Sequence, residues 1–570
     1  MRDCLILYFL CLANLLFMHY TVISTCAVEW PLFFISFIDN IASITLEIAI
    51  ISLILFFLTK RRIKRSATIC FVVTLVWSFS NIMYSRFFHQ YLSFSAFEQA
   101  DALMDGLIIN CIINEVKWID LYFLLIPILF GILHNKTKEK QLGYWDIKKH
   151  LLLILFPVGL VLFSHFAYCY SNPAYRYVSY YLNQIYKKHF YTKSISIEPI
   201  YATFHRGSIR MLLTESLMNL SGPMNLSEHQ MQMIKNEVDD ISEKQRVSTI
   251  NQDIRNVIFI LVESYMAFTS DLIVENKEVT PYLNSLKRDS TVYYNGNICP
   301  NTTIGESSDG QFIYMSGLLP LRSMITVSKV APNRIPGMAD ILKRNKGLQT
   351  RMIIPTSISM WKQDVMCQKY GFEDLYSSQD YANGDIDNLN DEQLFQLVKE
   401  IDVKKDNPFF SVILTMSMHQ PYTEFIDDSF PISDTIYSES LKSYLNACHY
   451  TDRQIGRYLD FLKENDLFDN SLIVITSDHN VPSNAIVLSE DMDAQALPLY
   501  IINSGIAREC LWRGDCNQLD VYTTVLDILG IKDEWMGLGH TLYNRNFQQS
   551  VTNDTWNISE WIILSDYFGL

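Results

Sequence analysis

The first 170 residues alternate long apolar runs with short polar segments, whereas the rest of the chain is mostly polar. A helix needs roughly 20 predominantly apolar residues to cross the hydrocarbon core of a bilayer. Five runs approach that length and predict transmembrane helices at residues 5–23, 42–58, 67–83, 118–133 and 151–168. No convincing small-residue cleavage site follows the first run and further spans come after it, so we expect it to remain as a helix and not to be removed as a signal peptide.

Basic residues between these runs predict the orientation of the chain in the membrane. The segment KRRIKR at residues 60–65 follows the second run and HNKTKEKQLGYWDIKKH follows the fourth, while residues 85–117 carry little positive charge. Lys and Arg in short loops are retained on the cytoplasmic side. We therefore expect the N-terminus inside and everything after Tyr170 outside. If the first or the third run were only a buried or interfacial helix, the large polar region would instead lie in the cytoplasm.

The polar region is expected to begin with a juxtamembrane connector at residues 171–253. Its first part, NPAYRYVSYYLNQIYKKHFYTK, predicts an amphipathic segment near the membrane surface, and SEHQMQMIKNEVDDISEKQR predicts an exposed helix. From residue 254 to 570, short β-branched and aromatic runs alternate with amphipathic helical stretches. This alternation predicts an α/β domain with a mainly parallel central sheet, preceded by a transmembrane bundle of about five helices at residues 1–170.

Charge and cysteine content narrow the function classes. The net charge of −15 argues against nucleic acid as a partner, because proteins that bind it carry a basic footprint. None of the cysteines after residue 254 has the spacing of a zinc knuckle. Cys510 and Cys516 could close a small disulfide in an oxidising compartment, and the alternative is a pair of unlinked thiols.

Acidic and imidazole side chains follow three of the expected strands. NVIFILV runs into Glu263, FFSVILTMSM runs into His419, and SLIVITS runs into Asp478 and His479. Each residue alone is also explained as a solvated loop residue. Because ligands bind at the carboxyl ends of strands in open α/β sheets, their joint arrival at one edge predicts a metal site. Carboxylate oxygens and imidazole nitrogens are ligands for Zn or Mn.

The segment NICPNTTIGESSDGQFIYMSGLLP holds several hydroxyls that could be a nucleophile, a helix cap or plain loop residues. Ser308 is followed three residues later by Gln311, which predicts a capping box with Ser308 as the N-cap. Ser307 would then lie just before the helix, near the positive end of its dipole, where a phosphate can also bind. A serine there with its oxygen on a divalent metal is an activated nucleophile. Thr302 and Thr303 lie farther back in the loop.

Several motifs follow one another in a specific order, although none is decisive alone. They are NVIFILVES, GESSDGQF, MWKQDVM, MSMHQPY, VITSDHN, and LPLYII followed by NQLDVYTTVLDILGI and MGLGH. Together with the apolar runs, they resemble the lipoteichoic acid synthase family of phosphoglycerol transferases, within the alkaline phosphatase and sulfatase superfamily. GESSDGQF is similar to that family's G-x-T-S-D-x-E-F, and the last segments are similar to the closing signature of the superfamily.

The resemblance implies an alkaline phosphatase/sulfatase-like catalytic domain with one divalent ion, typically Mn, with Zn or Mg as alternatives. It implies Ser307 as nucleophile and His419 as a hydrogen-bond donor or acid/base group at the substrate phosphate. Trp361 and Gln363 stand at the positions expected to bind substrate. The metal ligands that the resemblance implies are Glu263, Ser307, Asp478 and His479.

The chain departs from the family pattern at three places. Ser307 stands where the family has threonine, which is a conservative change because only the hydroxyl is used. Ser477 and Asn480 flank the Asp-His pair where the family has glycines, which keeps the ligands and alters the freedom of the loop. Gln363, beside Lys362, stands where the family has an arginine, so the fixed bidentate fork for a glycerol-phosphate head group is lost.

The implied activity is transfer of a phosphoglycerol-type group from a membrane phospholipid to a hydroxyl on a glycan, lipid or polymer, through a phospho-serine intermediate. The protein would be a multi-pass plasma membrane protein with an extracytoplasmic catalytic domain. Alternatives are a phosphoethanolamine transferase, a phosphodiesterase and a sulfatase, the last disfavoured because Ser307 is not followed by the x-P-x-R of formylglycine sites. A transporter, with Glu47 and Asp120 on its path, or an inactive membrane-anchored binding protein is the non-enzymatic alternative.

Overall fold

The structure, a computed structural model, describes the chain in several stretches. They are residues 2–25, 33–88, 91–93, 116–137, 203–204, 207–220, 223–244 and 254–569, the last with gaps at 323, 385, 387, 405–407, 421, 423–429, 434–436, 482–485, 489–491, 493–495 and 544–550. The chain forms two compact units, residues 1–221 and residues 222–570. The division falls inside the segment expected to be a connector, whose extent as a separate region stays a prediction.

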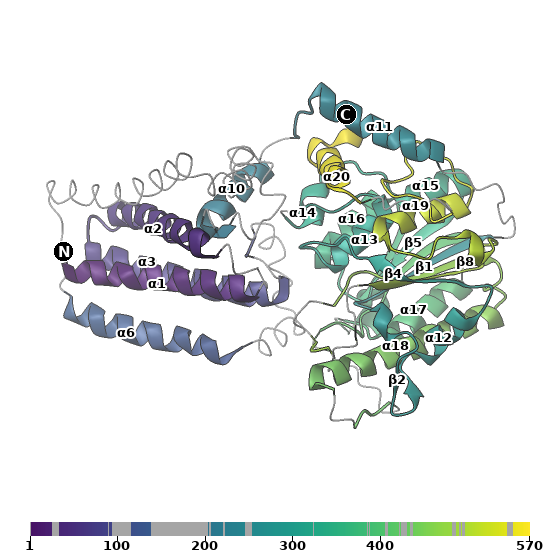
Figure 1. The fold of residues 1–570 in the computed structure, drawn as a ribbon, viewed down its shortest axis with the longest axis horizontal. Coiled ribbons are helices and arrows are strands. Elements are labelled where there is room, and N and C mark those ends of the chain that lie inside the picture. Colours follow the sequence, from purple (N-terminus) through teal and green to yellow (C-terminus); the bar gives the residue numbers. More distant parts are fainter. Residues whose placement is uncertain are drawn as a thin grey trace. The chain divides into compact units, whose positions relative to one another are not determined.

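The first unit is built from apolar helices (Figure 1). They are α1 (Arg2–Thr25), α2 (Phe33–Leu58), α3 (Ile63–Phe88) and α6 (Tyr122–Lys136), the last preceded by the short η3 (Trp118–Leu121). Within the described residues, the segments long and apolar enough to span a membrane are Ile6–Thr25, Ile63–Arg86 and Trp118–Lys136, with a shorter apolar helix at Ser43–Leu58. Four of the expected runs are therefore helices, and the fifth, residues 151–168, lies outside the described residues.

Charged residues inside this unit have structural partners. Asp120 accepts two hydrogen bonds from the Arg86 guanidinium, at 2.7 and 2.8 Å, and both side chains are buried. Glu47 accepts a hydrogen bond at 2.8 Å from the backbone N–H of Arg210, in the first turn of α10 (Ser208–Leu220). A buried charge is costly unless it is paired or capped, so the ion pair with Arg86 explains Asp120 by packing within the unit. Glu47 is bonded through Oε1, while its Oε2 has no hydrogen-bond partner among the described residues.

The second unit contains a sheet whose strand order is β10-β4-β9-β8-β1-β7-β5-β6. Neighbouring strands are parallel except where β9 pairs with β4 and β8, so the mainly parallel sheet is confirmed. In chain order the strands are β1 (Asn256–Val262), β4 (Tyr293–Cys299), β5 (Gln349–Ile353), β6 (Asp374–Tyr376), β7 (Phe409–Leu414), β8 (Ser471–Ser477), β9 (Leu497–Ile502) and β10 (Cys516–Asn517). A separate hairpin pairs β2 (Ile273–Val274) with β3 (Lys277–Glu278).

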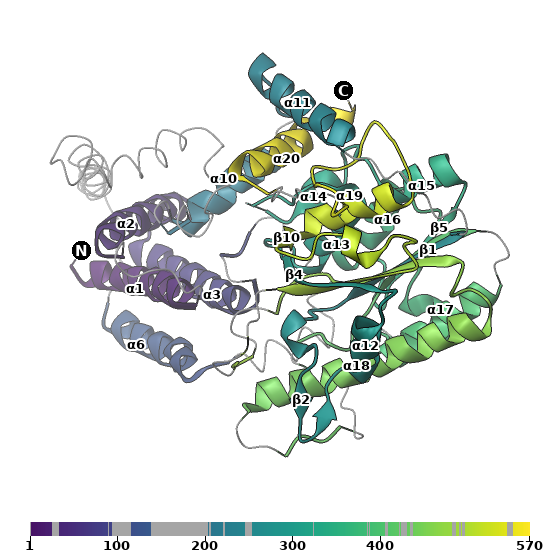
Figure 2. The same ribbon diagram turned by 45° about the vertical axis from the view of Figure 1, so that its right-hand side comes forward.

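Helices cover both faces of this sheet, as both views show (Figures 1 and 2). One face carries α13 (Ser307–Ser316), α15 (Met338–Lys346), α16 (Gln363–Tyr370) and α19 (Gln518–Ile528), and the other carries α12 (Pro281–Arg288), α17 (Asp391–Val403) and α18 (Glu439–Glu464). Every residue of β1, β8 and β9 is buried. Continuous apolar strands of this kind are expected where helices exclude water from both faces of a sheet.

Among the described residues of the second unit, the other α-helices are α11 (Glu228–Lys244), α14 (Thr326–Val330) and α20 (Asn553–Ser565). The helix expected in the connector is α11, and most of its described side chains are exposed while Ile234 is buried. Met224, just before α11, donates its N–H to the carbonyl of Leu564 in α20 at 2.8 Å. Cys510 and Cys516 are both free thiols, so the alternative without a disulfide holds.

Candidate active site

Three neighbouring strands deliver the polar residues of the site to one edge of the sheet. Strand β1 lies between β8 and β7 and is parallel to both, with Val262 opposite Ser477 at the ends of β1 and β8. The residues that directly follow these strands therefore lie at the same edge of the sheet. Glu263 follows β1, Asp478 and His479 follow β8, and the chain after β7 leads to His419. The sheet topology confirms the predicted convergence at the carboxyl ends of the strands.

Glu263, Asp478 and His479 form a compact buried cluster. One ligand atom from each of the three lies within 4.8 Å of the others. The His479 Nε2 atom is 3.3 Å from Glu263 Oε1 and 3.7 Å from Asp478 Oδ2. Glu263 and Asp478 are each 6% exposed, and His479 is 3% exposed. The charge of the nearby His419 imidazole also lowers the pKa of Glu263.

The orientation of the His479 ring follows from its second nitrogen. His479 Nδ1 lies 2.8 Å from the carbonyl oxygen of Asn480, which can only accept a hydrogen bond. In the neutral ring Nδ1 therefore carries the proton, and the lone pair of Nε2 faces the carboxylates. A metal-binding histidine is held in this way, with its other ring nitrogen donating to a carbonyl.

Ser307 brings its hydroxyl to the same cluster. Its Oγ is 3.2 Å from Glu263 Oε2 and 3.0 Å from His479 Nε2. Ser307 is the first residue of α13, so the hydroxyl also lies at the positive end of the helix dipole. Two carboxylates, an imidazole and a hydroxyl, from three different segments, thus surround one point.

The predicted capping box at Ser308 is wrong. The N-cap is Glu306, two residues before Ser308, so the helix already begins at Ser307; Glu306 has the unusual backbone conformation φ 38°, ψ −107°. The Ser308 hydroxyl donates to the carbonyl of Gly305 at 2.8 Å and does not accept an N–H. The side chain of Gln311 pairs with Gln363 in place of the backbone of Ser308. Because the carbonyls of Gly305 and Glu306 already accept the first helical N–H groups, no side-chain cap is needed at Ser308.

The loop before the helix is fixed by a buried carboxylate. Asp309 Oδ2 accepts hydrogen bonds from the N–H of Thr303 and of Gly305, both at 3.0 Å, and from the Thr303 hydroxyl at 2.8 Å. Thr303 Oγ1 is also 2.8 Å from the carbonyl oxygen of Leu321. The hydroxyl of Thr303 therefore belongs to the framework of the loop, in contrast to that of Ser307.

Gly310 allows α13 to approach the loop that carries Asp478 and His479. A Cβ atom at this position would lie 2.1 Å from the carbonyl oxygen of Asp478 and 2.7 Å from its carbonyl carbon. Any side chain would therefore collide with backbone that cannot rotate away. The same oxygen of Asp478 accepts a hydrogen bond at 2.6 Å from Gln518 Nε2 in α19. A lone glycine inside a helical stretch was the sequence signal for such a close approach.

Burial and mutual charge shift the pKa values of the cluster. Burial, with the charge of Glu263 added, raises the pKa of Asp478 to about 7. Burial opposes the charged form of Glu263 too, but the His479 imidazole outweighs it and holds the pKa of Glu263 below its ordinary value. Burial also opposes the charged form of His479, yet the two carboxylates raise its pKa well above the ordinary value. Such mutual perturbation in one place is typical of functional sites.

The donor set fits a single divalent cation. Two buried carboxylates face one imidazole, which leaves an excess of negative charge that a cation would offset. Oxygen and nitrogen ligands of this kind suit Mn or Zn, and the hydroxyl of Ser307 supplies a further oxygen. The residues that would hold the ion are Glu263, Ser307, Asp478 and His479.

The other expected site residues have different surroundings. His419 is half-buried, and its Nδ1 lies 2.7 Å from the carbonyl oxygen of Gln420, which leaves Nε2 for other contacts. Trp361 is half-buried, and it and Lys362 have left-handed backbone conformations in the short η6 (Met360–Lys362). Gln363 is buried, and its amide makes two reciprocal hydrogen bonds to the amide of Gln311, at 3.0 and 3.2 Å. The substrate-binding roles of Trp361 and Gln363 stay predictions.

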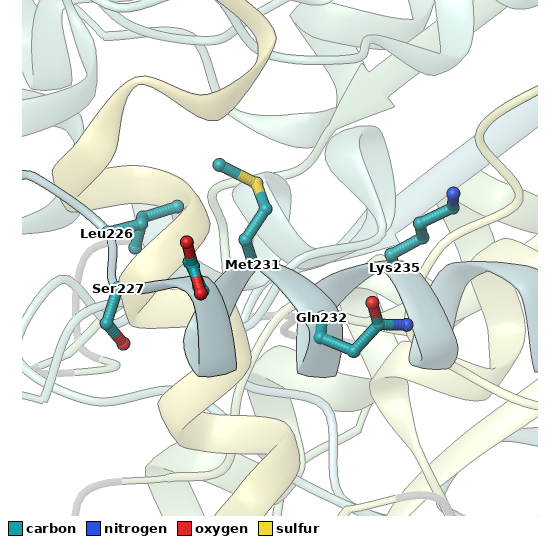
Figure 3. A pocket seen from close by; sticks show the side chains of 6 residues that line it. Leu226, Ser227, Met231, Gln232 and Lys235 are labelled. Carbon is teal, nitrogen blue, oxygen red and sulfur yellow. The ribbon is translucent and has the colours of Figure 1, made fainter.

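A separate pocket of about 330 Å³ lies along α11 (Figure 3). It contains none of the residues of the cluster. Its lining consists of Leu226, Ser227, Glu228, Met231, Gln232 and Lys235.

Comparisons with known proteins show what kind of domain carries this cluster. Residues 255–531 match the sequence model of the sulfatase family. Lipoteichoic acid synthase 2 of Bacillus subtilis is 25% identical over 535 residues, covering 87% of this chain and 77% of that protein. Lipoteichoic acid synthase of Staphylococcus aureus (strain USA300) is 23% identical over 535 residues, covering 88% of this chain and 78% of that protein.

A solved structure resembles the fold across most of the chain. The integral membrane lipooligosaccharide phosphoethanolamine transferase A of Neisseria meningitidis aligns with a TM-score of 0.54 at 15% identity, covering 92% of this chain and 95% of that one. The protein is thus a membrane protein with a sulfatase-type domain. Residues 255–531 form a sulfatase-family domain, and the protein is an enzyme that resembles the lipoteichoic acid synthases of the alkaline phosphatase and sulfatase superfamily.

Proposed function

We propose that this protein is a metal-dependent transferase that moves a phosphoglycerol-type group from a membrane phospholipid to an acceptor hydroxyl. The observation that carries the proposal is the Ser307 hydroxyl, 3.2 Å from Glu263 Oε2 and 3.0 Å from His479 Nε2, at the start of a helix. The curated relatives named lipoteichoic acid synthases, which span most of the chain, support a phosphotransferase role. The phosphoglycerol group and the phospho-serine intermediate are the finer part of the proposal.

The first step is attack by Ser307 on the donor. Ser307 Oγ, having lost its proton to solvent, forms a bond to phosphorus, the bond from phosphorus to the diacylglycerol oxygen breaks, and that oxygen takes a proton as diacylglycerol departs. The phosphoglycerol group remains on the serine. When bound, a divalent cation lowers the pKa of the attacking hydroxyl and offsets charge on the phosphoryl oxygens. The amide end of α13 favours the same negative charge.

The second step transfers the group to the acceptor. A hydroxyl of a glycan, lipid or polymer attacks the phosphorus, and the bond from phosphorus to Ser307 Oγ breaks. We propose that His419 Nε2 donates a proton to the departing diacylglycerol oxygen in the first step. In the second step the same nitrogen accepts the proton of the acceptor hydroxyl. Its Nδ1 is already bonded to the carbonyl of Gln420, which fixes the ring for this exchange.

The membrane helices bring the enzyme to its donor, because they embed the first unit in the bilayer that contains the phospholipid. We infer a multi-pass protein of the plasma membrane, with the catalytic unit outside and Trp361 and Gln363 near the donor head group. Protease added to intact protoplasts or spheroplasts should release a large soluble fragment that contains residue 254 onward. Full protection of that fragment would contradict the orientation.

The test of the reaction uses the purified full-length protein with Mn²⁺ and phosphatidylglycerol labelled in either the acyl chains or the head group. We expect release of labelled diacylglycerol and, without acceptor, a head-group adduct on the peptide that contains Ser307. Ser307→Ala should form neither, whereas the matched variant Ser308→Ala should form both. An adduct on Thr302 or Thr303, or normal turnover by Ser307→Ala, would show that the nucleophile is another hydroxyl.

The choice of donor tests the alternatives within the superfamily. Phosphatidylethanolamine is offered in parallel, because Gln363 lacks the bidentate fork that favours one head group. Turnover with that lipid alone would identify a phosphoethanolamine transferase. Release of diacylglycerol with no transfer to any hydroxyl but water would identify a phosphodiesterase.

A further inference from the structure

Ser264 occupies the turn directly after β1, between the candidate ligand Glu263 and the core of the unit. It is 2% exposed, and its backbone φ is +50°, a value that residues other than glycine adopt rarely. Nothing in the sequence pattern marked this serine. Each of its three polar groups nevertheless has a partner at or beside the metal cluster.

The hydroxyl of Ser264 holds Glu263. Ser264 Oγ donates to Glu263 Oε1 at 2.8 Å. This hydrogen bond restrains Oε1, one of the two carboxylate oxygens of Glu263. The other oxygen, Oε2, is the one that lies 3.2 Å from Ser307 Oγ. The carboxylate is thereby turned so that Oε2 faces the nucleophile.

The backbone of Ser264 holds Asp478 in a similar way. Its N–H donates to Asp478 Oδ1 at 2.9 Å, and the N–H of His479 donates to the same oxygen at 2.8 Å. The second oxygen, Oδ2, is left on the side of His479 Nε2, at 3.7 Å. Ser264 thus restrains one oxygen of each carboxylate: it leaves Asp478 Oδ2 toward His479, and it fixes Glu263 so that Oε1 lies 3.3 Å from His479 Nε2 while Oε2 lies 3.2 Å from Ser307 Oγ.

The left-handed turn that makes both contacts possible is locked by Tyr444 of α18. The Tyr444 hydroxyl donates to the carbonyl of Ser264 at 2.9 Å and accepts the N–H of Met266 at 3.1 Å. The N–H of Tyr265 donates to Ser477 Oγ at 2.8 Å. Backbone bonds on both sides of Ser264 therefore hold a conformation that the residue would not adopt by itself.

We propose that Ser264 is a positioning residue that orients Glu263 and Asp478 for a divalent cation, the hydroxyl acting on Glu263 and the backbone N–H on Asp478. The inference rests on the proposed function, since it concerns the same metal site. Outer partners that fix ligand orientation in this way contribute to metal affinity, and their loss weakens binding or activity about 10- to 100-fold.

The test measures Mn²⁺ affinity of the full-length protein in detergent by titration calorimetry, with thermal unfolding of the metal-free protein alongside. Ser264→Ala removes only the hydroxyl, and Ser264→Gly removes it while relieving the left-handed backbone. Both should bind Mn²⁺ about 10- to 100-fold more weakly than the wild type. Turnover at saturating Mn²⁺ should recover most of the wild-type rate, because neither variant loses a group that touches substrate.

The matched control is Ser559→Ala in α20. Ser559 is equally buried, and its hydroxyl donates to the carbonyl of Leu319 at 2.7 Å, outside the cluster. This variant should unfold at a lower temperature and keep the wild-type Mn²⁺ affinity. If Ser264 had a purely structural role, its variants would likewise unfold at a lower temperature and keep the wild-type Mn²⁺ affinity.

The outcomes separate the inference from the proposed function. Wild-type affinity in Ser264→Ala, or affinity restored in Ser264→Gly, would overturn the role of the hydroxyl while leaving the metal site intact. If the wild type bound no Mn²⁺, or if Glu263→Ala bound Mn²⁺ as tightly as the wild type, the proposed metal-dependent function would be wrong. Weaker binding in both Ser264 variants, with Ser559→Ala unchanged, would support the inference.

Discussion

Gly310→Ala tests how closely α13, which carries the proposed nucleophile Ser307, must approach the loop with the proposed ligands Asp478 and His479. Gly310 is the fourth residue of α13, and an added Cβ would lie 2.1 Å from the carbonyl oxygen of Asp478, whereas ordinary contact begins near 3.4 Å. The difference, 3.4 minus 2.1, is 1.3 Å, and the obstacle is backbone. The helix and the loop must therefore separate by about that amount, taking Ser307 away from His479.

The expected loss is large for activity and small for stability. Added to the present 3.0 Å between Ser307 Oγ and His479 Nε2, a 1.3 Å shift breaks that contact. A displacement of about 1 Å costs roughly 10²-fold in rate, which is about 2.7 kcal/mol of barrier. Overpacking costs about 1–3 kcal/mol of folding stability, and the better helix propensity of Ala offsets about 1 kcal/mol of it.

The assay is diacylglycerol release from labelled phosphatidylglycerol at saturating Mn²⁺, with thermal unfolding in parallel. The matched control is Gly131→Ala in α6, where an added Cβ meets nothing within 4 Å. The control should keep both activity and stability. If Gly310→Ala retained more than a third of the wild-type rate, the close packing of α13 on Asp478 would not be what positions Ser307, and the reasoning would be refuted.

Three further predictions follow from the same geometry. Chelation should abolish turnover and lower the unfolding temperature, and added Mn²⁺ should restore both. When alanine replaces Glu263, Asp478 or His479, the metal content measured by mass spectrometry should fall together with activity. Full metal occupancy in all three variants would disprove the ligand assignment. Ser308→Ala should cost about 0.5–1.5 kcal/mol by denaturant unfolding, as loss of one hydrogen bond does, and keep turnover; an inactive, stably folded variant would contradict its structural role. Gln311→Ala and Gln363→Ala should each cost about 1–3 kcal/mol, because each leaves a buried amide unpaired, and the double variant should cost less than the sum; strict additivity would argue against the pair.

The sequence predicted the parts of the fold that depend on hydrophobic pattern. Continuous apolar runs such as NVIFILV and SLIVITS are fully buried strands, since helices cover both faces of the sheet. Parallel neighbours also bring their carboxyl ends together whatever lies between them in the chain. Glu263 and Asp478 could therefore be paired from the sequence although more than 200 residues separate them.

The start of α13 could not be predicted in the same way. The capping-box pattern describes what Ser308 and Gln311 would do in an isolated helix. In the folded unit, Glu306 takes φ 38° and Gln311 finds the amide of Gln363, 52 residues away. Ser264 was missed for a related reason, because its left-handed turn depends on Tyr444, which is 180 residues distant. Partners this remote leave no trace in local periodicity.

The four hydroxyls between residues 302 and 308 show why partners, more than residue type, select a nucleophile. The Thr303 hydroxyl contacts Asp309 and the carbonyl of Leu321, and the Ser308 hydroxyl donates to the carbonyl of Gly305, so both stabilise the loop. Ser307 alone of these contacts the buried carboxylate and imidazole. The reaction requires only an oxygen at that position. A serine in place of the threonine that similar proteins carry there is consequently compatible with the same chemistry, provided that α13 keeps its contact with Asp478.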